Sequence, residues 1–226
     1  MAIEKPKKRR FLLGDVSEVV MNNICHAILI WYRRIWYAFR AYILEKPRGL
    51  DFHQRNQKLK VKGKNHGYAI TPESHLKQIF SVLNITEKNS FLDIGCGKGF
   101  VLTYAAKYPY QKIMGIEIDP KTAEIARKNI LILNLDNRIN ISIADATNYA
   151  YDEYDHFFLY NPFPGSILKI VIERILESLN TKPREITIIY FHPSDHNVLM
   201  DTGRFKVVEK LHSLIKDYDT YIYKNI

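Results

Sequence analysis

Three glycines and two carboxylates are the residues of this chain whose types and spacing point most clearly to chemistry. In the stretch FLDIGCGKGF, Asp93 closes an apolar run, and three glycines follow at every second position: Gly95, Gly97 and Gly99. Glycines have no Cβ, so a turn built from them lets the backbone pass close beneath a bound molecule. Glu117 closes the next apolar run, where a carboxylate can accept hydrogen bonds from both hydroxyls of a ribose. The pattern predicts a nucleoside site.

The same loop lacks the fingerprints of two other kinds of nucleotide site. The dinucleotide pattern G-x-G-x-x-G needs glycine at position 100, which is Phe100, and no G-x-x-x-x-G-K-[ST] occurs. Pyrophosphate binding is therefore poorly supported. Structural alternatives stay open for each part alone, because a glycine turn also occurs in proteins without a cofactor, and Glu117 could serve a helix headed by Asp119 and Pro120.

Two further segments follow the expected third and fourth strands. Asp145 and Ala146 lie in ISIADAT, and Asn161, Pro162 and Phe163 begin NPFP. An asparagine amide oxygen and the carbonyl of residue 162 can accept the two hydrogens of an amino group, while an aromatic ring can stack on a planar acceptor. The alternatives are a simple turn at position 145 and a proline-rich turn that buries Phe163 in the core.

In this order the motifs resemble those of class I S-adenosylmethionine-dependent methyltransferases, over roughly residues 67–226. The resemblance implies S-adenosylmethionine as the cofactor, no metal, and methyl transfer beside the NPFP loop. The implied cofactor-binding residues are Asp93, Gly95, Gly97, Gly99, Glu117, Asp145 and Ala146. The implied catalytic residues are Asn161, Pro162 and Phe163.

Two departures from related patterns concern the acceptor. NPFP is similar to the (D/N/S)-P-P-(Y/F/W) loop of amino-methyltransferases, but its ring is third, and Pro164 occupies the fourth position. The chain is also similar to a bacterial group that has D-x-G-C-G-K-G-R, G-V-E and N-P-F motifs and no assigned substrate. Phe100 stands where that group usually has arginine. Tyr68 and His192 are further candidates for the cleft, each with a structural alternative.

The alternation of helical and strand patterns predicts an α/β fold with a doubly wound, seven-stranded, mainly parallel sheet. The resemblance adds an antiparallel last hairpin. Strands are expected near 90–94, 112–118, 140–144, 155–160, 186–191, 205–211 and 219–224. Helices are expected near 71–83, 98–107, 120–134, 166–179 and 195–201.

Charge divides the chain into a basic N-terminal extension, residues 1–66, and a catalytic domain, residues 67–226. The extension has 15 lysines and arginines against 5 acidic residues, so it carries the whole excess of a chain whose formal net charge is +9. Its basic residues include the cluster KPKKRR and four lysines at alternating positions: 58, 60, 62 and 64. In an extended chain, alternating positions place the four ammonium groups on one side, which suits the phosphates of RNA or of anionic lipid. A solvated linker is the alternative.

A long amphipathic helix is predicted inside this extension. Its apolar stripe consists of Ile24, Ile28, Trp31, Ile35, Phe39 and Tyr42, and Arg33 and Arg40 lie on the opposite face. We expect neither a membrane span nor a signal peptide, because charged and polar residues interrupt every apolar window. Packing on the domain, covering the cleft and lying on a membrane surface remain as alternatives for the stripe.

Two cysteines, Cys25 and Cys96, are too few for a disulfide framework, so we expect reduced thiols without a disulfide partner in a cytoplasmic protein. Cys96 is expected to fill space within the loop. Peripheral association with the inner membrane surface stays open. The predicted function is methyl transfer to an unidentified acceptor, with an amino nitrogen of a nucleic acid or protein as a candidate. The alternative is a non-catalytic adaptor attached to RNA or membrane through residues 1–66.

Overall fold

The computed structural model of the chain describes residues 27–28, 30–53, 69–213 and 218–226. Several features predicted from the sequence lie outside these residues: KPKKRR, Ile24, Cys25, the alternating lysines and Tyr68. The described residues from position 69 onward are built on one seven-stranded sheet. The strands are β1 (Ser90–Ile94), β2 (Lys112–Glu117), β3 (Ile139–Ile143), β4 (His156–Tyr160), β5 (Thr187–Phe191), β6 (Phe205–Leu211) and β7 (Thr220–Asn225).

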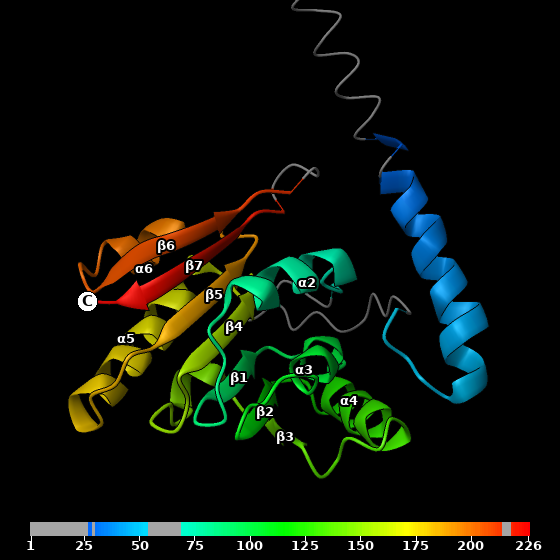
Figure 1. Cartoon of the computed structure of the whole chain (residues 1–226), viewed down its shortest axis with the longest axis horizontal. Helices are drawn as coiled ribbons and strands as arrows, with labels where there is room; N and C mark the ends of the chain where they lie inside the picture. Colours follow the sequence, from blue (N-terminus) through cyan, green and yellow to red (C-terminus); the bar gives the residue numbers. More distant parts are fainter. Residues whose placement is uncertain (1–26, 29, 54–68, 214–217) are drawn as a thin grey trace, which may run out of the picture.

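The strand order is β3-β2-β1-β4-β5-β7-β6, as Figure 1 shows. All pairs from β3 through β5 are parallel, whereas β7 pairs antiparallel with both β5 and β6. The order reverses direction between β1 and β4, which is the topological switch where open α/β sheets bind ligands. The predicted doubly wound sheet with an antiparallel last hairpin is confirmed.

Helices cover both faces of the sheet (Figure 1). One face carries α2 (Glu73–Val82), α3 (Phe100–Ala105) and α4 (Pro120–Ile132), and the other carries α5 (Gly165–Thr181) and α6 (His196–Met200). The central strands are buried on both sides, and β1 and β5 are buried at every residue. Their near-continuous apolar runs are therefore typical of parallel strands between two helical layers.

Helix boundaries follow local chemistry. Asp119 caps α4 as expected, since its carboxylate accepts from the Thr122 amide over 2.8 Å. Helix α3 begins at Phe100, later than predicted, because Gly99 has φ of 83° and stands outside the helical region. Helix α2, expected from position 71, begins at Glu73, and Pro72 before it makes no side-chain cap.

The N-terminal helix contacts the domain through its polar face. Residues 30–39 are helical and continue through η1 (Arg40–Glu45) and η2 (Lys46–Arg48), which ends at Gly49. Arg40 forms an ion pair of 2.9 Å with Glu73, and Arg33 donates to the Tyr218 hydroxyl over 3.2 Å. The two arginines thus find acceptors on the domain.

In the described residues the apolar stripe of this helix faces away from the domain, so packing on the domain, one of the three alternatives, is not observed there. The arginines anchor the opposite face, which turns the stripe outward. The large side chains of the helix and of η1 that are 39–65% exposed include stripe residues and their neighbours: Ile28, Trp31, Tyr32, Ile35, Trp36, Phe39, Tyr42, Ile43 and Leu44. Within the described residues, no helix is both long enough and apolar enough to pass through a bilayer.

Candidate functional site

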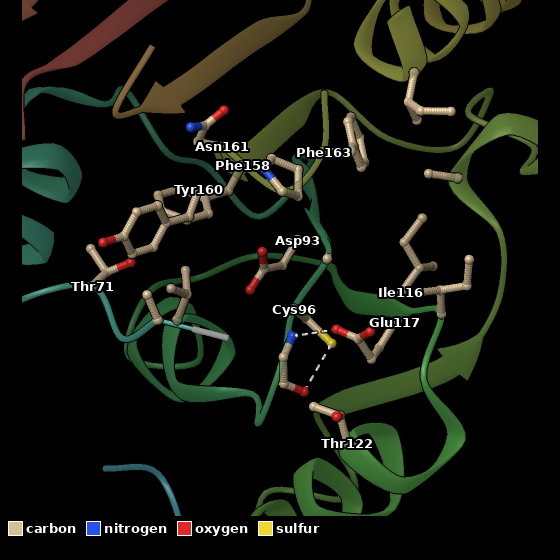
Figure 2. Close-up of a pocket in the computed structure, with 18 of the residues that line it drawn as sticks. Thr71, Asp93, Cys96, Ile116, Glu117, Thr122, Phe158, Tyr160, Asn161 and Phe163 are labelled. Carbon is tan, nitrogen blue, oxygen red and sulfur yellow. Dashed lines mark hydrogen bonds between the residues drawn. The ribbon is translucent and has the colours of Figure 1, made fainter. Parts of the chain in front are cut away.

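A cavity of about 570 Å³ opens at the carboxyl ends of β1, β2 and β4. Figure 2 shows Asp93 and Glu117 on its floor and the residues after β4 above them. The lining includes the predicted residues Asp93, Gly95, Gly97, Glu117, Asp145, Ala146, Asn161, Pro162 and Phe163. One edge of one sheet therefore collects motifs that are spread over 70 positions of the sequence.

The glycine loop takes a backbone path that other residues rarely adopt. Gly95, Gly97 and Gly99 have φ of 78°, 54° and 83°. The amides of Gly95 and Cys96 both donate to the Ile116 carbonyl over 2.9 Å, which ties the loop to β2. A Cβ on Gly95 would lie 2.9 Å from Cβ of Pro162. The loop and the NPFP turn thus meet without room for a side chain between them.

Two buried carboxyl groups form the floor. Burial, together with the nearby Glu117, raises the pKa of Asp93 well above its ordinary value. Burial also raises the pKa of Glu117, although hydrogen bonds from the amides of Asp119 and Gly97, each 3.0 Å, act in the opposite direction. Both acids would ionise more readily beside a ligand that offers positive charge or hydroxyl donors.

Asp145 follows β3 and lies on the cavity wall. Its carboxylate accepts from the Thr147 amide over 3.0 Å and so caps the short helix η3 (Ala146–Asn148). Ala146 lies beside it, and its carbonyl accepts from the Tyr151 hydroxyl over 2.7 Å. Asp145 therefore stabilises a turn, as the structural alternative predicted, and it also lines the cavity.

The NPFP turn shows a constrained backbone at the end of β4. Asn161 has φ of 34°, unusual for a residue with a side chain. Its amide oxygen accepts from the hydroxyls of Ser194, at 3.0 Å, and Tyr190, at 3.3 Å. Figure 2 shows this amide pointing away from Asp93. Phe163 is only 7% exposed and packs in the core beside α5, while part of it still lines the cavity.

Sequence reasoning missed three residues at the other end of the cavity: Thr71, Tyr160 and Tyr218. Burial and the neighbouring Tyr218 raise the pKa of Tyr160 above its ordinary value. Thr71 is buried, and among the described residues its hydroxyl has no hydrogen-bond partner. Tyr160 directly precedes Asn161, so its position could have been inferred. Tyr218 comes from the connection between β6 and β7, where no local motif marks it.

His192 also lines the cavity, as the sequence suggested. It follows β5 and has φ of 56°, so the ends of both β4 and β5 carry a non-glycine residue in the left-handed region. Such strain concentrates at ligand sites when the surrounding contacts hold it in place. The His192 ring meets the Tyr218 ring edge-on at 5.9 Å.

Cys96 fills space, as expected. It is buried and unpaired, and burial raises the pKa of its thiol well above the ordinary value. A Cβ added to Gly115 of β2 would lie 2.7 Å from the Cys96 sulfur, so the missing side chain at Gly115 makes room for the loop. A protonated, enclosed thiol is a poor nucleophile.

Comparisons with known proteins agree with this geometry. A family model described as a methyltransferase domain matches residues 91–182. An rRNA adenine N-6-methyltransferase of Lysinibacillus sphaericus is 26% identical over 119 residues, which are 52% of this chain and 46% of that protein. A type II methyltransferase of Paramecium bursaria Chlorella virus XZ-6E is 32% identical over 120 residues, 53% and 29% of the two chains. This chain thus matches less than half the length of either relative.

The fold agrees with that of solved methyltransferases. An RNA methyltransferase from Salinibacter ruber, solved with S-adenosyl-L-homocysteine, has a TM-score of 0.50 and 19% identity, and covers 69% of this chain and 92% of its own. At that identity the likeness establishes the fold alone. Residues 91–182, which match the family model, run from β1 to α5 and include Asp93, Glu117 and the NPFP turn.

Proposed function

We propose that this chain is a class I S-adenosylmethionine-dependent methyltransferase and that it transfers a methyl group from S-adenosylmethionine to an acceptor bound beside the NPFP turn; the methyltransferase-domain match over residues 91–182 supports this. The observation that carries the proposal is the pair of buried carboxyl groups, Asp93 and Glu117, beside a glycine loop that leaves a cavity of about 570 Å³. A space of this size suits a drug-sized ligand.

The residues of the cavity fit this cofactor. Glu117 would accept the ribose hydroxyls, and Asp93 would face the positively charged part of the donor, since each acid gains from charge-assisted hydrogen bonds. The glycines leave the backbone accessible, and Asp145 and Ala146 would border the adenine.

When bound, S-adenosylmethionine supplies an activated methyl group on a sulfonium, and its transfer to an amine forms a C–N bond and releases a thioether and a proton. Because the donor is already activated, the protein mainly aligns the acceptor and excludes water. We assign this alignment to Asn161, Pro162 and Phe163. The left-handed backbone of Asn161 and the close contact of Pro162 with Gly95 would keep the turn rigid.

The proposed acceptor is an amino nitrogen of a nucleic acid or a protein. The main-chain carbonyl of residue 162 would accept an amino hydrogen, and the Asn161 amide oxygen would accept the other only by exchanging its hydrogen bonds from Ser194 and Tyr190. Tyr160 and Tyr218 on the cavity wall suit a planar group, which could stack against an aromatic ring. A nucleobase amine is favoured because one relative is named an rRNA adenine N-6-methyltransferase.

Methyl transfer can be tested with S-adenosylmethionine labelled in its methyl group. The full chain is incubated with total RNA, with a protein extract, and with each after nuclease or protease digestion. We expect label to enter RNA in a nuclease-sensitive form, and Glu117→Ala should remove most of it. Glu124→Gln, on an exposed carboxylate of α4, is the matched control. No incorporation into any fraction, despite cofactor binding, would favour the adaptor alternative.

We also propose that the N-terminal helix lies on an anionic membrane surface, which makes the protein a peripheral one in the cytoplasm. The outward face is apolar and includes two tryptophans, and Arg34, Lys46 and Arg48 are exposed beside it. Glu45 is the only acidic residue between positions 27 and 50, and it is buried. A large apolar area with flanking cations is the pattern of a helix that lies on an anionic lipid surface.

Flotation with vesicles that contain or lack phosphatidylglycerol tests this attachment. The wild-type chain should float with the anionic vesicles, and Trp31→Glu with Ile35→Glu should leave it in the pellet fraction. Leu131→Glu, 61% exposed on α4, is the control that should still float. RNA retention without flotation would assign the helix to nucleic acid. A dimer in light scattering that the double variant dissolves would assign the stripe to a second copy of the chain.

A further inference from the structure

Lys98 is the one loop residue with a long charged side chain, and that side chain is completely buried. It lies between Gly97 and Gly99, within the glycine loop that forms part of the proposed cofactor site. Its ammonium group contacts Oδ1 of Asp51 at 2.6 Å, across 47 positions of sequence. A buried ammonium needs such a partner, because its desolvation is otherwise very costly.

Asn129 joins the same two segments through its side-chain amide. It is 1% exposed, and its amide nitrogen donates to the carbonyls of Asp51 and Lys98, each at 3.1 Å. Its amide oxygen accepts from the Asp51 amide over 2.9 Å. Helix α4 therefore holds the backbone of the glycine loop and the backbone of the N-terminal segment together.

The next residues of that segment cover the start of α3. The rings of Phe52 and His53 meet the Phe100 ring edge-on, at 5.4 and 5.6 Å between centroids. Phe100 lines the cavity, so these two rings support one of its walls from behind. Phe100 is also the position where the similar bacterial group usually has arginine.

The segment is itself held in shape by Glu45. One oxygen of this buried carboxylate accepts from the amides of Phe52 and His53, each at 3.0 Å, and the other contacts the His53 ring. Burial alone would raise the pKa of Glu45, but these hydrogen bonds outweigh it and lower the pKa. Glu45 is thus an ionised anchor that closes residues 45–53 into a compact turn, which we name the N-terminal hook.

We propose that the N-terminal hook (residues 45–53) is a positioning element of the cofactor loop, with Asp51 and Phe52 as its contact residues. The hook lies within the basic extension, yet it supports the loop through Lys98 and one cavity wall through Phe100. The extension is then more than an attachment segment, because its last described part completes the site. This inference rests on the proposed function for its binding consequence only.

The test uses the full-length chain and two measurements. The first is the affinity for S-adenosylhomocysteine by titration calorimetry. The second is hydrogen exchange of residues 94–100 without ligand. Asp51→Asn should weaken binding roughly 10- to 100-fold and speed exchange in the loop, because a displaced loop loses alignment with the ligand. Glu185→Gln is the matched control, since it breaks an exposed lysine–carboxylate pair that also spans 2.6 Å.

A second substitution separates charge pairing from general damage. Lys98→Met removes the buried charge, so Asp51→Asn should cost little further affinity in that background. Should Asp51→Asn fail to fold, Phe52→Leu tests the ring contact and should also weaken binding and speed exchange. Affinity and exchange equal to those of Glu185→Gln would overturn the inference. Faster loop exchange in a chain whose wild type binds no S-adenosylhomocysteine would support the hook and refute the proposed function.

Discussion

The Gly97 amide donates to a carboxylate oxygen of Glu117 over 3.0 Å, which joins the glycine loop to the tip of the neighbouring strand. The ends of β1 and β2 are therefore held together by one of the residues assigned to the ribose. Glu117 turns one carboxylate oxygen toward the Gly97 amide and the other toward the Asp119 amide.

Replacing Glu117 by alanine should weaken S-adenosylhomocysteine binding by about 1.5 to 3 kcal/mol, because charged hydrogen bonds to the ligand are lost. Titration calorimetry measures this directly. Glu124→Gln, at an exposed carboxylate of α4, should bind like wild type. Equal affinities for the two variants would remove Glu117 from the site.

Asp93→Asn should stabilise the ligand-free protein at neutral pH while it weakens cofactor binding. The pKa of Asp93 is raised on folding, so the native acid holds its proton more tightly than the unfolded one. Its ionisation therefore lowers stability as pH rises through the native pKa, and asparagine avoids this cost. Thermal unfolding with and without ligand checks both effects. A lower unfolding temperature for the variant at neutral pH would contradict the assignment.

Cofactor binding should release protons. The raised pKa values of Asp93 and Glu117 fall when a positively charged or hydroxyl-donating ligand arrives, so affinity should increase with pH between the bound and free pKa values. Titrations of S-adenosylmethionine in two buffers with different ionisation enthalpies count the protons. Proton uptake would contradict the predicted direction.

Gly95→Ala should distort the cavity more than the same change at another left-handed glycine. A Cβ at Gly95 meets Pro162 at 2.9 Å, whereas one at Gly203 has nothing within 4 Å, although both have positive φ. Gly203→Ala should cost only backbone strain, roughly 1 to 2 kcal/mol. Gly95→Ala should cost more stability and also reduce cofactor affinity. The comparison needs denaturant unfolding and one titration for each variant.

Asn161→Gly should lower methyl transfer about tenfold or more and leave cofactor affinity within about twofold, because alignment of the acceptor is lost but the donor site is not. Glycine tolerates the φ of 34°, so the variant isolates the amide from the backbone strain. Initial rates with labelled S-adenosylmethionine give the answer. Wild-type rates would mean that the amide serves only the turn, through Ser194 and Tyr190.

Local chemistry explains why the sheet and the floor of the site could be predicted. Asp93 and Glu117 each close an apolar run, and Asp119 with Pro120 marks the start of α4. The outward face of the N-terminal helix could not be predicted, because that choice depends on partners far away in sequence. Arg33 meets Tyr218 across 185 positions.

Long-range contacts also explain why the N-terminal hook and the direction of the Asn161 amide could not be predicted. No sequence pattern near Lys98 indicates Asp51 as its partner, because their ion pair forms only when residues 45–53 pack against α4. The Asn161 side chain turns toward Ser194, a residue from the end of another strand. Contacts of this kind arise from tertiary packing, and the periodicity of the sequence does not predict them.

Titration calorimetry of the full chain with S-adenosylhomocysteine and, separately, with NAD tests the identity of the cofactor. We expect one-site binding of S-adenosylhomocysteine that Glu117→Ala weakens, and no saturable binding of NAD. Saturable NAD binding with no response to S-adenosylhomocysteine would contradict the proposed function.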